Sequence, residues 1–173
     1  MKTIISYTIF SLLLLLSSQN AFSQKKQERE NKKNEAFTET KTLVDSAQFI
    51  YVPNRAFPQG GQSIDLTTNY GFIKITGDNA EGDLPFFGRG FQSHYGNDGG
   101  IKFNGTMENK KVEINEKKRT ITFSFEVKDK DHYRVSMEIS YNGNTSVNVT
   151  SNNRSHISYQ GEIDKIEEKE SKK

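Results

Sequence analysis

The sequence contains no cysteine. No disulfide bond can therefore stabilise the fold, although small exported domains often depend on such bonds. A lipid anchor that needs a cysteine directly after a signal peptide is excluded as well. Stability must come from a hydrophobic core, and an exported product would not be lipid-anchored.

The sequence also lacks a large excess of charge of one sign. Its 24 lysines and arginines nearly balance 22 aspartates and glutamates, which gives a formal net charge of +2. Removal of an N-terminal segment that contains Lys2 would lower the charge by one, to about +1. Nucleic-acid binding usually requires a strong basic excess, so we expect no nucleic-acid partner.

Motifs typical of catalysis are missing too. The chain has no nucleophile elbow, no phosphate-binding glycine loop and no dinucleotide fingerprint. No helical pattern follows the glycines at 88, 90, 99 and 100, so they offer no helix N-terminus to a phosphate. His94, Asp83 and Arg89 could be assembled into an acid–base site, but nothing in their spacing requires one. We expect a protein that is not an enzyme.

The candidate metal ligands form no recognisable pattern. His94, His132 and His156 lie on three different predicted segments without metal-ligand spacing. The acidic residues between Asp78 and Asp83 lack the alternating oxygen ligands and the closing glutamate of a calcium-binding loop, and a hairpin turn explains them better. We predict no metal and no cofactor.

The N-terminus has the pattern of a secretory signal peptide over residues 1–23. Lys2 supplies the positive charge, residues 4–16 are apolar, and Ala21-Phe22-Ser23 places small residues before a cleavage site at Gln24. The apolar run is short for a membrane span, although an uncleaved anchor is the alternative. The pattern predicts a periplasmic or secreted protein without a stable membrane span.

Residues 24–35 form a charged, polar lead-in that we expect to be solvated and partly disordered. Apolar residues then recur at Phe37, Val44 and Ala47, close to the spacing of one helical face. We therefore expect a helix over about 34–46 that docks through a narrow apolar stripe. A solvated outer face explains its alternating lysines and glutamates better than a partner surface does.

The chain beyond residue 48 reads as short strands. A first strand should end at Pro53, and residues 64–66 and 72–76 make a hairpin candidate. Clean alternation follows in three stretches, 111–115, 121–127 and 133–141, and strand signals continue through 147–149 to 157–163. One solvent-exposed polar face on each strand, together with the short turns between strands, indicates an antiparallel meander.

We therefore predict a mainly β fold, an antiparallel meander curled into a barrel or sandwich, with an N-terminal helix. The expected organisation is a single β-rich domain over residues 36–163 and a charged tail over 164–173. We expect that tail to be a frayed helix or disordered, beginning near Glu162.

The stretch from Gly82 to Gly105 concentrates glycines, aromatic residues, an arginine and a histidine. Pro85 keeps the residue before it out of a helix, and Phe86 and Phe87 point to opposite sides of an extended chain, so at most one of them can enter a shared core. One interpretation is a long connection whose aromatic residues plug the end of the β fold. The other is a recognition loop on a rigid scaffold. The candidate binding residues are Pro85, Phe86, Phe87, Arg89, His94 and Tyr95.

Several segments together resemble a known family. They are YVPN at 51–54, Tyr70 before a strand at 72–77, LPFFGR at 84–89, GGIKFNG at 99–105 and ISYQGEI at 157–163. Over about residues 36–163 the chain resembles the bacterial secreted family catalogued as domain of unknown function 4251. The resemblance implies an exported β-rich domain of Gram-negative bacteria, often lipid-anchored and without an established activity. The missing cysteine departs from that anchoring.

Two functional hypotheses follow. In the first, the protein is a non-catalytic periplasmic module that binds an envelope protein through the loop at 84–95. In the second, it carries a small apolar ligand inside a barrel whose inward side chains leave a cavity, with the same loop as a lid. The inward side chains of that carrier would be Phe123, Phe125, Tyr133 and Met137.

Overall fold

The computed structural model describes residues 2–90 and 99–166, with side chains from residue 24 onward. Helix α1 spans Lys2–Asp45. The chain divides into two compact units, residues 1–36 and residues 37–173, so α1 contributes to both. No helix among the described residues is long and apolar enough to cross a membrane.

Ten strands make up one antiparallel sheet, in the order β5-β4-β3-β1-β10-β9-β8-β7-β6, and β2 pairs beside this path with β1. The strands are β1 (Gln48–Pro58), β2 (Ile64–Asp65), β3 (Phe72–Thr76), β4 (Asn79–Leu84), β5 (Ile101–Thr106), β6 (Glu108–Asn115), β7 (Thr120–Lys128), β8 (His132–Ser140), β9 (Asn144–Ser151) and β10 (Ile157–Lys165).

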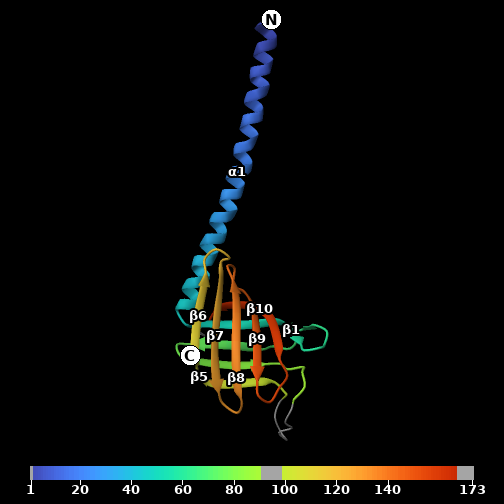
Figure 1. Ribbon diagram of the computed structural model, residues 1–173, viewed down its shortest axis with the longest axis vertical. Coiled ribbons are helices and arrows are strands. Elements are labelled where there is room, and N and C mark those ends of the chain that lie inside the picture. Colours follow the sequence, from blue (N-terminus) through green and yellow to red (C-terminus); the bar gives the residue numbers. More distant parts are fainter. Residues whose placement is uncertain (1, 91–98, 167–173) are drawn as a thin grey trace, which may run out of the picture. The chain divides into compact units, whose positions relative to one another are not determined.

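The sheet curls so far that it nearly closes into a barrel. In Figure 1, β6 to β9 run nearly vertically at the front, and strands of the other half, such as β1 and β5, cross behind them at a steep angle. The strands at the two ends of the sheet, β5 and β6, are joined in sequence by Met107 alone. Near this corner the Asn104 amide of β5 donates to Asp129 Oδ2, just beyond β7 (3.2 Å). The predicted curled antiparallel meander is confirmed.

The core lies between the two halves of the curled sheet, because inward residues alternate along nearly every strand. β7 places Ile121, Phe123, Phe125 and Val127 inside and its polar residues outside. The aromatic rings interlock, with Phe49 and Phe123 centroids 5.7 Å apart in an edge-to-face arrangement that adds to simple burial. The predicted alternation of β7 to β9 is thus confirmed.

The last turns of α1 belong to the β-rich unit. Phe37 and Val44 are buried in the core, as the predicted stripe requires. Thr40 is also buried, and its hydroxyl donates to the Tyr141 carbonyl oxygen (2.9 Å). The helix ends at Asp45, close to the expected end, but it begins at Lys2 and includes the charged lead-in. The lead-in is helical and largely exposed, with the pair Glu28–Lys32 (2.8 Å) one turn apart.

The prediction that Pro53 ends the first strand is wrong. β1 continues to Pro58, and its register with β10 shifts between Pro53 and Arg55. Proline is tolerated at such an irregularity because no ladder hydrogen bond is required of it there. Gly161 of β10 lies opposite Pro53. The two strands approach so closely that a Cβ atom on Gly161 would collide with the Val52 carbonyl oxygen.

The predicted hairpin between residues 64–66 and 72–76 is also wrong. β2 pairs with the far end of β1, whereas β3 pairs with the beginning of β1 and with β4. The acidic segment after the β3–β4 turn is strand β4 itself. Its polar composition is not typical of a strand, but pairing with β3 on one side and β5 on the other keeps it extended.

Two further expectations differ from the structure. β6 does not have one buried face, because all eight of its residues are exposed, including Val112 and Ile114 at 42% each. It is the end strand of the sheet and pairs only with β7, so its apolar side chains are covered from one side. The tail does not begin at Glu162, because β10 continues to Lys165 in pairing with β1.

Candidate functional site

The segment that follows β4 is attached to the start of β10 by a buried tyrosine. The Tyr159 hydroxyl donates to the Pro85 carbonyl oxygen (2.8 Å). Burial raises the pKa of Tyr159 far above that of a free phenol, so this hydroxyl stays protonated and remains a donor at all physiological pH values. The segment therefore leaves β4 from a fixed point.

The two phenylalanines after Pro85 have different environments. Phe86 is partly buried and packs against the core, and the Arg154 guanidinium lies 5.0 Å from its ring centroid. Phe87 is 39% exposed. The prediction that at most one of the two rings enters the core is confirmed. Arg154 covers the inner ring, and the outer ring faces solvent.

The backbone of Arg89 is held by hydrogen bonds, whereas the residue is exposed to solvent. Its amide donates to Ser155 Oγ (3.0 Å), and its carbonyl oxygen accepts from the Ser155 amide (2.9 Å). Gly90 forms an antiparallel bridge with Arg154. These contacts join residues 89–90 to the β9–β10 connection as a short ladder, so the Arg89 side chain projects from an ordered backbone.

Two glycines permit this close attachment. A Cβ at Gly88 would collide with Ser155 Oγ and with the Phe86 ring. A Cβ at Gly71 would lie 2.7 Å from Pro85 Cδ, so the β2–β3 connection also presses on this segment. Tyr70, which is 88% exposed, directly precedes Gly71 in the sequence. We define Tyr70, Phe87 and Arg89 as the exposed triad.

The structure brings together four of the six residues predicted for binding: Pro85, Phe86, Phe87 and Arg89. His94 and Tyr95 lie outside the described residues. Their role in binding remains a prediction, as does the role of the other four.

Sequence reasoning missed the residues that hold the segment in place. Arg154, Ser155 and Tyr159 are about 65 to 75 positions away in the chain, and nothing in the local pattern around them indicates contact with residues 85–90. Tyr70 was among the segments that resemble the family but was not predicted as a binding residue. The sequence did contain a signal in the polar run 152–156, which includes Arg154 and Ser155. However, the pairing of this run with Arg89 and its flanking glycines depends on the sheet topology.

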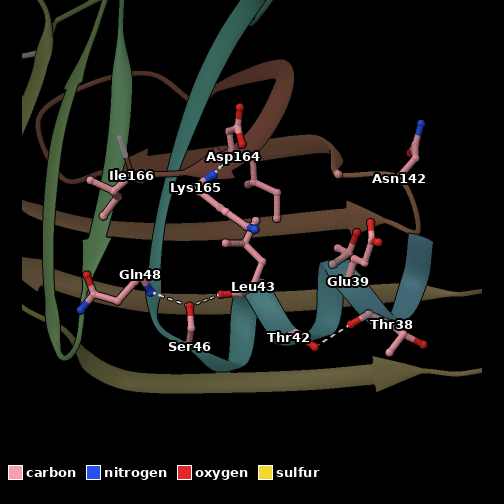
Figure 2. A pocket seen from close by; sticks show the side chains of 13 residues that line it. Thr38, Glu39, Thr42, Leu43, Ser46, Gln48, Asn142, Asp164, Lys165 and Ile166 are labelled. Atoms are coloured by element: carbon pink, nitrogen blue, oxygen red, sulfur yellow. Dashed lines mark hydrogen bonds between the residues drawn. The ribbon is translucent and has the colours of Figure 1, made fainter. Parts of the chain in front are cut away.

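A groove of about 890 Å³ lies between the last turns of α1 and the end of β10 (Figure 2). Several of its polar side chains are bonded to the protein's own backbone. Ser46 Oγ donates to the Leu43 carbonyl oxygen (2.7 Å), and Asp164 Oδ1 accepts from the Lys165 amide (2.7 Å). A binding site usually offers a few convergent free polar groups, so this groove is a weaker candidate than the exposed triad.

The side chains proposed to line a carrier cavity fill space instead. Phe123, Phe125, Tyr133 and Met137 are each at most 4% exposed. The Phe123 and Phe125 centroids are 5.6 Å apart, and Phe103 lies 5.4 Å from Tyr133. These are contact distances for aromatic rings. The described interior therefore gives the carrier hypothesis no support.

The histidines that the structure describes are separated. His132 Nε2 lies 2.8 Å from Glu126 Oε2 on the outer face of the sheet, and His156 is exposed in the β9–β10 connection. Within residues 2–90 and 99–166, no three His, Asp or Glu side chains gather in a metal-binding arrangement.

Residues 31–163 match the family model described as "Domain of unknown function (DUF4251)". The chain belongs to this family. A crystal structure of a DUF4251 family protein from Bacteroides eggerthii DSM 20697 is similar, with a TM-score of 0.59 and 18% sequence identity. The similarity covers 75% of this chain and 87% of that one, and at this identity it shows a shared fold. No curated protein matches the chain. The DUF4251 match begins within α1 and ends within β10, so it includes the exposed triad and the residues that hold it.

Proposed function

We propose that this protein is an exported, non-catalytic interaction module that binds a protein of the cell envelope through the loop at 84–95. The observation that carries the proposal is the exposure of Phe87 and Arg89 on a backbone fixed by Ser155 and Tyr159. Aromatic residues and arginine are the residue types that contribute most binding energy in protein interfaces. A fixed backbone lowers the entropy lost on binding.

Tyr70 adds a second exposed aromatic side chain, on the connection whose Gly71 packs closely against Pro85. Together with Phe87, which is 39% exposed, and Arg89, it offers a partner two aromatic side chains and one guanidinium. These groups are costly to leave in water on a monomer and favourable to bury in an interface. The N-terminal pattern at residues 1–23 supports export, and the near-barrel fold suits a scaffold that presents a loop.

Site-specific photo-crosslinking tests the proposal. A photoreactive amino acid replaces Phe87 in one variant and Val52 in a control, and each variant is irradiated in cells that produce the protein. Val52 is 44% exposed, so the two probes have similar access to solvent. We expect one discrete protein adduct from position 87 and none of that mass from position 52. No adduct at 87, or the same adducts from both positions, would refute the proposal.

A further inference from the structure

A polar hollow lies on the outer face of β7, β8 and β9. It has a volume of about 260 Å³ and opens over the backbone of Phe125 and Val135, whose side chains point into the core. Two cross-strand rows line it. The first is Glu126–Arg134–Thr150 and the second is Ser124–Ser136–Asn148, each aligned by the register of the three strands. The serines are short, which leaves the hollow between longer neighbours.

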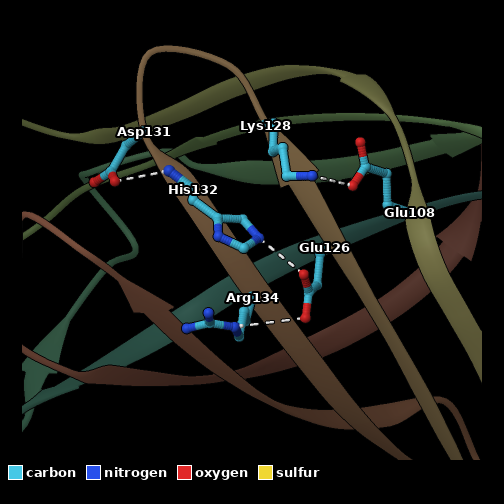
Figure 3. Close-up of polar contacts among 6 residues, drawn as sticks. All are labelled: Glu108, Glu126, Lys128, Asp131, His132 and Arg134. Atoms are coloured by element: carbon cyan, nitrogen blue, oxygen red, sulfur yellow. Dashed lines mark hydrogen bonds and ion pairs between the residues drawn. The ribbon is translucent and has the colours of Figure 1, made fainter.

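The Glu126 carboxylate is held from three sides. His132 Nε2 lies 2.8 Å from Oε2, and Arg134 Nε lies 3.5 Å from Oε1 (Figure 3). The side chain of Asn109 also hydrogen-bonds to Glu126. Asn109 stands at the register shift of β6 with a φ of 52°, and such irregularities re-aim side chains. The bond from His132 is the main cause of the lowered pKa of Glu126, so this group remains a carboxylate at neutral pH.

Glu126 also forms an ion pair with the half-exposed side chain of Arg134. The guanidinium uses Nε for Glu126, and its two terminal nitrogens have no partner within the described part of the chain. Figure 3 shows these nitrogens on the side of Arg134 away from Glu126. A guanidinium held by Nε presents a planar pair of N–H donors, which matches the two oxygens of a carboxylate.

We propose that this hollow binds an acidic saccharide, a sugar chain that carries a carboxylate, with the acid group on Arg134. Ser124, Ser136, Thr150 and Asn148 offer hydroxyl and amide groups that can donate to and accept from sugar hydroxyls. The hollow has no exposed aromatic residue among its lining side chains, so hydrogen bonds carry the recognition.

The surface next to this hollow defines where the acid group can lie. The next row, Glu138–Ser146–Gln160, lines an adjacent hollow of about 480 Å³ that also contains Glu162. Its serine, asparagine and glutamine side chains suit further sugar hydroxyls, but its two glutamates repel a carboxylate. The acid group is therefore placed at Arg134, and neutral sugar units extend towards β10.

Calorimetric titration of the full chain tests the proposal with three probes: a glucose disaccharide, the same disaccharide with one glucuronate in place of glucose, and inorganic phosphate. We expect the acidic disaccharide to bind at least about tenfold tighter than the neutral one, because a charged hydrogen-bonded pair is added. Equal binding of the two disaccharides, binding of phosphate as tight as that of the acidic disaccharide, or no binding would overturn it.

Two variants and one control localise the binding. Arg134→Gln should weaken the binding of the acidic disaccharide by about ten- to a hundredfold and leave the binding of the neutral one unchanged. Ser136→Gln should fill the hollow and weaken both. The control Arg55→Gln removes the same charge from exposed Arg55 of β1 and should change neither. An equal loss in Arg134→Gln and Arg55→Gln would show a general charge effect and refute the site. Unchanged melting temperatures establish that the variants fold.

Discussion

The Arg154 guanidinium lies 5.0 Å from the centre of the Phe86 ring, and the same side chain donates from Nη1 to the Gly99 carbonyl oxygen (2.9 Å). One arginine therefore contacts both ends of the connection between β4 and β5. The contact with the ring excludes water from the inner phenylalanine, and the hydrogen bond holds the start of the return to β5.

Replacement of Arg154 should loosen both ends of this connection. We expect Arg154→Ala to lower the free energy of unfolding by about 1–3 kcal/mol, the sum of a cation–π contact and a charge-assisted hydrogen bond. Thermal unfolding measures the loss, and Arg55→Ala is the matched control. A loss no larger than that of the control would show that Arg154 does not hold the segment.

Two buried tyrosines should respond in opposite ways to the same substitution. Tyr159→Phe removes the hydrogen bond to Pro85 and should cost about 1 kcal/mol, whereas the buried Tyr51 hydroxyl has no hydrogen-bond partner among the residues that the structure describes. Tyr51→Phe should therefore be neutral or stabilising. Chemical denaturation of both variants decides the matter, and a clear loss in Tyr51→Phe would mean that its hydroxyl is bonded in solution.

Gly161 should tolerate no side chain. A Cβ there would collide with the backbone of Val52 and Pro53, which cannot move without breaking the pairing of β1 with β10. We expect Gly161→Ala to cost about 3 kcal/mol or more. The control is Gly99→Ala, because a Cβ at Gly99 meets no atom of the described residues within 4 Å. Similar melting temperatures for the two variants would contradict the close approach of the strands.

Glu126 should give the fold a measurable pH dependence. Its pKa is lowered in the folded state, chiefly by the hydrogen bond from His132. A carboxyl group of this kind stabilises the fold above its unfolded pKa, and the contribution disappears as the pH falls through the folded pKa. The stability difference between the wild type and Glu126→Gln should therefore shrink as the pH is lowered below 4.5, the ordinary pKa of a glutamate.

Denaturation of both proteins at a series of acidic pH values measures this effect. Glu81→Gln, a change at an exposed residue of β4, controls for the loss of one negative charge. The same shrinkage in the control would assign the effect to net charge and not to the contact with His132.

The strands that the sequence predicts well are those whose burial follows a simple period. β7 and β8 alternate apolar and polar residues without interruption, because one face of each meets the core and the other meets water. β4 could not be recognised in this way. Its residues Asn79, Gly82 and Asp83 have little strand preference, and pairing with β3 and β5 makes the segment extended.

The site was predictable only in part for a similar reason. Local composition indicated Phe87 and Arg89 as unusual residues near a proline and between glycines. The segment that carries them is supported by Arg154 and Ser155, which lie just before β10. In the sheet, β10 is next to β1 on one side, and β4 is two strands from β1 on the other side. Contacts of this sequence separation depend on topology, and local patterns in one sequence do not encode them.

The measurement that tests the central claim most directly is the yield of the position-87 crosslink in an Arg89→Ala background, together with the melting temperature of the same variant. Arg89 is exposed, and its contacts with Ser155 are made by its backbone, so its side chain should be dispensable for folding. We predict loss of most of the adduct with an unchanged melting temperature. An undiminished adduct would show that Arg89 takes no part in binding, and a large fall in melting temperature would assign Arg89 to the fold instead of the interface.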